Sequence, residues 1–171
     1  MKAIIGIIGG SGIDQIEDLK RAQWKSVSSP FGSPSDDLLF GEIDDVPIVF
    51  LPRHGRGHKL TPTAINYRAN IDCLKRAGVT DIISLSAVGS LKEAYVPGNF
   101  VLVDQFIDRT FSREKTFFGE GCVAHVSFSH PIADRLQQAL HDTCKDLGLL
   151  SHLGGTYICM EGPQFSTLAE S

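Results

Sequence analysis

The sequence predicts an α/β fold with a largely parallel sheet, and two features of its hydrophobic pattern predict it. Short apolar runs rich in β-branched residues recur along the chain, several of them apolar at consecutive positions, as in strands buried on both faces. Two segments in which apolar residues have helical spacing lie between these runs. Strands and helices that alternate in this order are typical of a parallel sheet covered by helices.

The expected strands are short and are separated by glycine or proline; they span residues 3–8, 46–51, 81–87, 100–106 and 157–160. We expect the first helix to have Thr61 as its N-cap and Pro62 at its first position, and to end just before Gly78. We expect the second helix to begin near residues 130–131 and to end at Gly148. Its apolar stripe would consist of Ile132, Leu136, Ala139, Leu140, Cys144 and Leu147.

The domain organisation follows from length and from the absence of internal boundaries. A chain of 171 residues is long enough for one domain with a sizeable core, and no linker or repeat divides residues 1–171. Residues 26–45, which are rich in proline, glycine and aspartate, are expected to form loops and a hairpin. Residues 160–171 resemble a loop that enters a helix, so we expect this chain to be part of a longer protein.

Charge and cysteine content exclude several classes of function. The net charge is -4 and the lysines and arginines are scattered, which argues against nucleic acid and membrane surfaces as partners. No apolar run approaches the length of a membrane span, and no secretory leader is recognisable. The four cysteines are far apart and include no Cys-x-x-Cys pair, so we expect free thiols, no metal site and a cytoplasmic location.

A glycine-rich turn follows the first expected strand. Gly9, Gly10 and Gly12 surround Ser11, and a backbone of this kind can come close to an anion and bind it through successive N–H groups. The turn lacks the Gly-Lys-Ser/Thr of a nucleotide-binding P-loop, the third glycine of the dinucleotide fingerprint and the glycine pattern of a hydrolase elbow. A turn that ends a strand and binds no ligand is the alternative interpretation.

Two further strand ends carry groups that suit an anion. Arg53 offers a planar guanidinium with His54 beside it, and Ser86 lies at the end of another expected strand. Because ligands gather at the carboxyl ends of strands in open α/β sheets, these residues and Ser11 could converge on one tetrahedral anion. An exposed basic loop and glycines required only for packing remain the alternatives. His54 and His58 are four residues apart, but the intervening glycines disfavour the helix that a zinc pair would need.

A series of ordered motifs extends over nearly the whole chain. In chain order they are Gly6 to Gly12, Pro30-Phe31-Gly32, Arg53-His54-Gly55, Asn66 to Asn70, Gly89-Ser90-Leu91, Pro97-Gly98, Asp104 to Thr110, and Glu161-Gly162-Pro163 with Phe165-Ser166. In this order they resemble the 5′-methylthioadenosine phosphorylases, which form part of the trimeric branch of the purine nucleoside phosphorylase family. The resemblance implies an α/β fold with a mixed central sheet flanked by helices. Members of the family are normally longer, which implies that the C-terminal third is missing here.

The resemblance also implies roles for individual residues. The phosphate site would consist of Ser11, Arg53, His54, Ser86 and the backbone of Ala87. Phe165 would lie against the purine face, and Ser166 would affect the choice of substrate. His125 would reach into the pocket of a neighbouring subunit, and Tyr67 and Pro62 would lie near the ligand. Leu168 stands where an arginine is common in the family.

The implied reaction is phosphate-dependent cleavage of 5′-methylthioadenosine to adenine and 5-methylthioribose 1-phosphate by a homotrimer. Phosphate is a co-substrate, and no cofactor, metal or covalent intermediate is expected. Two alternatives stay open: a phosphorylase for methylthioinosine or another purine nucleoside, and a truncated fragment that binds phosphate without turnover.

Overall fold

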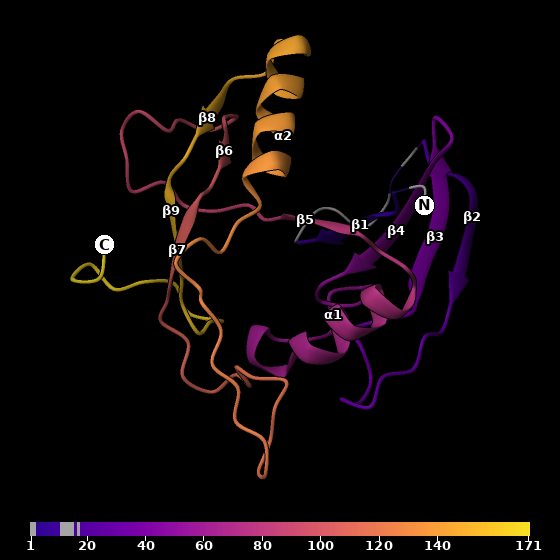
Figure 1. Ribbon diagram of the computed structural model, residues 1–171. Helices are drawn as coiled ribbons and strands as arrows, with labels where there is room; N and C mark the ends of the chain where they lie inside the picture. The colour runs from indigo at the N-terminus through magenta and orange to yellow at the C-terminus, as the bar shows by residue number, and fades with distance from the viewer. Residues whose placement is uncertain (1–2, 11–15, 17) are drawn as a thin grey trace. The chain divides into compact units, whose positions relative to one another are not determined.

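The computed structural model describes residues 3–10, 16 and 18–171, and the chain divides into two compact units (Figure 1). The first unit comprises residues 1–87 with 114–117, and the second comprises residues 88–113 with 118–171. The elements of the first unit are β1 (Ile5–Gly9), β2 (Lys20–Lys25), β3 (Leu38–Ile43), β4 (Val46–Pro52), the short 3₁₀ helix η1 (Pro62–Ala64), α1 (Tyr67–Arg76) and β5 (Asp81–Leu85). Those of the second unit are β6 (Phe100–Leu102), β7 (Gln105–Asp108), α2 (Asp134–Asp146), β8 (Ser151–Leu153) and β9 (Thr156–Cys159).

The first unit is built on a five-stranded mixed sheet with the strand order β2-β3-β4-β1-β5. Strands β4, β1 and β5 are parallel, whereas β3 runs antiparallel to both β2 and β4. In this register Gly9 lies opposite Pro52 on one side and Leu85 on the other, so three carboxyl ends are level. The α/β fold with a mixed central sheet, which the resemblance implies, is therefore confirmed, whereas the largely parallel sheet predicted from the hydrophobic pattern is parallel only in β4, β1 and β5.

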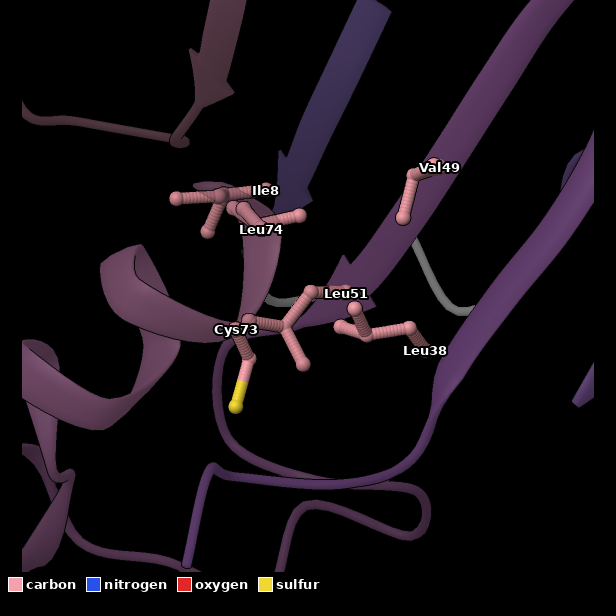
Figure 2. Packing of buried hydrophobic residues seen from close by; sticks show 6 residues of the cluster. All are labelled: Ile8, Leu38, Val49, Leu51, Cys73 and Leu74. Atoms are coloured by element: carbon pink, nitrogen blue, oxygen red, sulfur yellow. The ribbon is translucent and has the colours of Figure 1, made fainter. Parts of the chain in front are cut away.

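The core of the first unit lies between the sheet and α1 (Figure 2). Its buried members come from β1, β3, β4 and α1, and they are Ile8, Leu38, Val49, Leu51, Cys73 and Leu74. The buried residues of α1 recur at intervals of three and four along the helix, which places them on the face that meets the sheet. Helix α1 therefore covers the face of the sheet from which these β-strand side chains project (Figure 2).

The first helix begins later than the sequence predicts. Pro62 starts only a short 3₁₀ turn, Ile65 is extended with φ -67° and ψ 126°, and α1 begins at Tyr67. The side chain of Asn66 accepts a hydrogen bond from the amide of Ala69 at 3.1 Å, whereas the Thr61 side chain makes no capping hydrogen bond. An asparagine that satisfies a free helical amide therefore sets the start of this helix.

Residues 26–45, expected to form loops and a hairpin, contain only the first strand and the turn of a hairpin; its second strand, β4, lies beyond this range. Asp44 and Asp45 connect the strands with φ values of 47° and 61°, the left-handed conformation that tight hairpin turns require. Strand β2 was not predicted, because its residues are almost all exposed and its apolar members are only Ala22 and Trp24. Arg21, with φ 54°, lies where the pairing of β2 with β3 shifts register.

The second unit contains two parallel strand pairs, β6 with β8 and β7 with β9. The expected strand over residues 100–106 is divided at Asp104, whose carboxylate accepts a hydrogen bond from the Gly155 amide at 3.0 Å. Helix α2 ends as predicted before Gly148, which has φ 68°, but it begins at Asp134, and β8 was not predicted. Within the described part of the chain, no helix is long and apolar enough to cross a membrane.

Candidate functional site

The three level strand ends of the first unit continue to pair just beyond the strands. The Gly10 amide donates to the Leu85 carbonyl at 3.1 Å, and the Arg53 amide donates to the Gly9 carbonyl at 2.9 Å. These hydrogen bonds hold the residues after β1, β4 and β5 at one edge of the sheet. Ligands collect at such an edge in open α/β folds.

Arg53 and Ser86 meet at this edge. The Arg53 Nη1 donates a hydrogen bond to the Ser86 Oγ at 2.6 Å, which joins the predicted site residues of two different strand ends. Ala87 follows Ser86 directly, whereas Ser11 lies outside the described residues. The result is a fixed guanidinium at the edge of the sheet.

Gly10 is required by this close approach. A Cβ atom at this position would lie 2.7 Å from the Arg53 Nη2 and 2.9 Å from the Leu85 carbonyl oxygen. The guanidinium could move away, but the backbone carbonyl belongs to the sheet. The absence of a side chain at Gly10 therefore lets the Arg53 guanidinium approach the backbone at the end of β1.

His54 is held from several sides. Its side chain is nearly buried, with 9% exposure, and its Nδ1 lies 2.8 Å from the Leu60 carbonyl oxygen. A carbonyl oxygen only accepts hydrogen bonds, so Nδ1 carries a proton in this contact. The backbone carbonyl of His54 accepts hydrogen bonds from the amides of Lys59 and Leu60. The imidazole ring of His54 stacks on that of His58, with 4.2 Å between the ring centroids. These contacts fix the direction of the His54 ring and place a proton on its Nδ1.

Pro62 and Tyr67, both predicted to lie near the ligand, contact each other. The Tyr67 hydroxyl donates to the Pro62 carbonyl at 3.0 Å, which ties the 3₁₀ turn to the first turn of α1. Both belong to the same unit as Arg53.

The remaining predicted residues, His125, Phe165 and Ser166, belong to the second unit. His125 is exposed in a segment without regular structure, and the Phe165 side chain is 93% exposed. The Ser166 Oγ lies 2.8 Å from the Ser171 Oγ. Within this unit, the structure brings Phe165 and Ser166 together only as neighbours in the chain.

Sequence reasoning missed one charged pair beside the site, formed by Asp36 and Arg56. Partial burial alone would raise the pKa of the Asp36 carboxyl, but hydrogen bonds from the Arg56 side chain and from the Arg56 and Asp37 amides outweigh it. The pKa of Asp36 is therefore lower than usual. In sequence, Arg56 is only one more cation of a basic loop, and Asp36 lies twenty residues away. Only their shared contact reveals the pair.

The described residues contain no group of three or more His, Cys, Asp or Glu side chains that could hold a metal ion. Two shallow pockets of about 590 and 320 Å³ are each lined in part by Arg56, and neither is lined by Arg53 or Ser86. The arrangement of Arg53, Ser86 and Gly10 thus offers hydrogen-bond donors and positive charge at an open edge of the sheet, which is chemistry suited to an oxyanion.

The chain belongs to the phosphorylase superfamily, whose family model matches residues 4–171. Among individual relatives, it is 59% identical over its whole length to an S-methyl-5′-thioadenosine phosphorylase of Cereibacter sphaeroides. It is 60% identical over 98% of its length to one of Rhodospirillum rubrum. The chain spans 59% and 57% of these two relatives, or somewhat less than two thirds of their length.

Solved structures show the same likeness. The methylthioadenosine phosphorylase of Schistosoma mansoni in complex with adenine matches with a TM-score of 0.93 at 38% identity. The match covers 99% of this chain and 69% of that one. The similarity to this group of phosphorylases, expected from the ordered motifs, is therefore confirmed.

Proposed function

We propose that this chain carries the phosphate-binding part of an enzyme that cleaves 5′-methylthioadenosine with phosphate, giving adenine and 5-methylthioribose 1-phosphate. The observation that carries the proposal is the contact between Arg53 and Ser86 beside Gly10, at the level ends of three parallel strands. The substrate is taken from the names of the similar S-methyl-5′-thioadenosine phosphorylases.

In the proposed reaction, the N-glycosidic bond breaks while a phosphate oxygen forms a bond to the anomeric carbon, and the departing purine gains a proton. The enzyme must orient phosphate and stabilise a transition state in which positive charge develops on the sugar. Arg53 would bind and direct the phosphate, with Ser11, Ser86 and the Ala87 backbone as further donors. His54, whose Nδ1–H is bonded to the Leu60 carbonyl, would donate to phosphate through Nε2 of a protonated imidazole. Phosphate itself is the nucleophile, so the reaction needs no cofactor.

The other predicted residues complete the proposal. Phe165 would stack on the purine, Ser166 would influence substrate choice, and Tyr67 and Pro62 would border the ligand. His125 would contribute to the pocket of a neighbouring subunit in a homotrimer. We also propose that residues 1–171 form part of a single phosphorylase domain. A cytoplasmic location is supported by four free cysteines.

Replacement of Arg53 by alanine tests the phosphate site. We expect Arg53→Ala to abolish measurable phosphate binding by calorimetry. Where turnover of methylthioadenosine is measurable, its rate should fall about a hundredfold, since loss of one such donor costs on the order of 3 kcal/mol. Arg21→Ala is the matched control, because Arg21 is an exposed arginine of the same unit. Its guanidinium forms an ion pair with Glu42 at 3.2 Å. Unchanged phosphate affinity in Arg53→Ala would refute the proposed role.

The second candidate is phosphate binding without turnover by this chain alone, and the similarity to S-methyl-5′-thioadenosine phosphorylases does not favour it. The two candidates nevertheless predict different results. An assay of phosphate-dependent adenine release from methylthioadenosine, run beside phosphate calorimetry, separates the two candidates. Binding with no adenine release supports the second, and a parallel assay with methylthioinosine tests the choice of purine.

A further inference from the structure

We propose that Asp36 and Arg56 are positioning residues that hold the loop of residues 53–60 in the conformation that binds phosphate. This inference rests on the proposed phosphate site and adds two residues that act on the loop rather than on the anion. Arg56 is three residues after Arg53, so a simple reading of its charge would make it another phosphate ligand. Its contacts point to a different role.

The carboxylate of Asp36 binds both the side chain and the backbone of Arg56. It accepts from the Arg56 amide at 2.7 Å, from Nε at 3.0 Å and from Nη2 at 2.7 Å. The guanidinium is therefore engaged in the two-pronged geometry that arginine and carboxylate favour. The hydrogen bond to the amide also fixes the backbone of the loop itself, which an ordinary surface ion pair does not do.

Two more contacts hold the same loop against its surroundings. The Arg56 guanidinium also lies over the Trp24 ring, 4.1 Å from its centroid, so one face of the guanidinium is packed. Gly55 has φ 72°, and a Cβ there would lie 2.9 Å from the Ser35 carbonyl oxygen. The loop thus lies directly on residues 35–36, and only glycine permits so close an approach.

The residues that receive the loop are themselves anchored to α1. The Ser35 amide donates to the Asn70 Oδ1 at 2.7 Å, and the Asn70 Nδ2 donates to the Ser35 Oγ at 2.9 Å. Asn70 is buried in the helix that packs on the sheet. A continuous set of hydrogen bonds therefore links the core helix, through Asn70, Ser35 and Asp36, to the loop that carries Arg53 and His54.

The sign of one substitution distinguishes positioning from direct binding. If Arg56 attracted phosphate directly, Asp36→Asn would remove a competing negative charge and strengthen phosphate binding. If the pair positions the loop, the same substitution frees the loop and weakens binding. Arg56→Lys gives an independent comparison, because it keeps the charge but loses the planar fork.

The experiment measures binding of inorganic phosphate to the full chain by calorimetry. We expect Asp36→Asn and Arg56→Lys each to raise the phosphate Kd about tenfold or more, the effect typical of residues that orient a binding group. Asp72→Asn is the matched control, with an expected change of less than about twofold, since it lies outside the loop. Asp72 bonds Arg76 at 2.6 Å, and its side chain is 15% exposed against 13% for Asp36. Tighter or unchanged binding in Asp36→Asn overturns the proposal.

Hydrogen exchange separates failure of this inference from failure of the phosphate site. We expect faster exchange of the amides of residues 54–60 in Asp36→Asn than in the wild type or Asp72→Asn, with or without phosphate. If wild-type protein fails to bind phosphate, the phosphate site is refuted, and the exchange rates still decide whether the pair holds the loop. Equal exchange in all three proteins overturns the inference. If Asp36→Asn fails to fold, Arg56→Lys decides by the same two measurements.

Discussion

At the scale of single residues, the site depends on two close approaches that only glycine permits. Gly10 lets Arg53 lie against the end of β1, and Gly55 lets the following loop lie on Ser35. Each close approach helps to place a charged side chain, Arg53 or Arg56, although the glycine makes no hydrogen bond to that side chain. The glycines therefore control the position of Arg53 and Arg56, although neither glycine has a functional group of its own.

Gly10→Ala tests this control. The added Cβ would lie 2.9 Å from a backbone carbonyl of β5, which cannot rotate away, and 2.7 Å from the Arg53 guanidinium. We expect phosphate affinity to fall about tenfold, because even a modest displacement of a binding group is costly. Calorimetry with phosphate measures the effect, together with a thermal melt.

Gly119→Ala is the control for that substitution, since nothing lies within 4 Å of a Cβ at Gly119. It should leave both affinity and melting temperature unchanged. If Gly10→Ala bound phosphate with wild-type affinity, phosphate binding would not depend on the close approach of Arg53 to Gly10.

At the scale of secondary structure, the start of α1 shows what sequence patterns predict and what they miss. Thr61-Pro62 has the usual form of a helix start, and the chain does turn there, but only for the three residues of η1. Asn66 then sets the true start, and its Nδ2 also donates to the Phe31 carbonyl at 2.6 Å. That second bond joins segments thirty-five residues apart, and no local pattern reveals it.

The same limit explains the other differences. The strands β1, β4 and β5 were predicted because each contains a largely continuous apolar run, the pattern typical of strands covered on both faces. Strand β2 forms because β3 offers it a partner, and its exposed residues carry no such signal. The positions of Arg53 and Ser86 followed from strand ends, whereas the Asp36–Arg56 pair depends on a contact between distant segments. Sequence patterns therefore predicted three strands of the five-stranded sheet and the placement of Arg53 and Ser86 at strand ends. They did not predict the Asp36–Arg56 pair.

Asn66→Ala tests the capping assignment. We expect the free energy of unfolding to fall by about 1–2 kcal/mol, since the variant loses the cap and the hydrogen bond to Phe31. Thr61→Ala should change it by less than about 0.5 kcal/mol, because the Thr61 side chain makes no capping bond. Urea denaturation of both variants measures the difference. A larger loss of unfolding free energy in Thr61→Ala than in Asn66→Ala would indicate that Thr61, and not Asn66, caps the helix.

At the scale of the whole molecule, the two units differ in how much apolar surface they bury. Among the residues that the structure describes, every buried hydrophobic side chain belongs to the first unit, and the buried residues of the second are Thr110 and Glu161. Glu161 accepts from the amides of Phe111 and Ser112 at 2.6 and 3.0 Å. Polar contacts of this kind hold the second unit more than an apolar core does.

This difference predicts unequal protection from hydrogen exchange. We expect the amides of α1 to exchange more slowly than those of α2, although α2 is longer, because α1 has four buried residues and α2 has none. Mass spectrometry of peptides from the two helices measures the rates. Helix length alone would favour α2, so slower exchange in α2 would contradict the role given to burial.

The outer strand β2 has a consequence for how the protein behaves at high concentration. Along its open margin, an edge strand exposes unpaired N–H and C=O groups that can pair with a second molecule of the same protein and start aggregation. Here that margin carries Lys20, Arg21 and Lys25, so two copies approaching along it would meet like charges. Concentrated salt weakens such repulsion, and self-association through this margin should therefore increase with ionic strength.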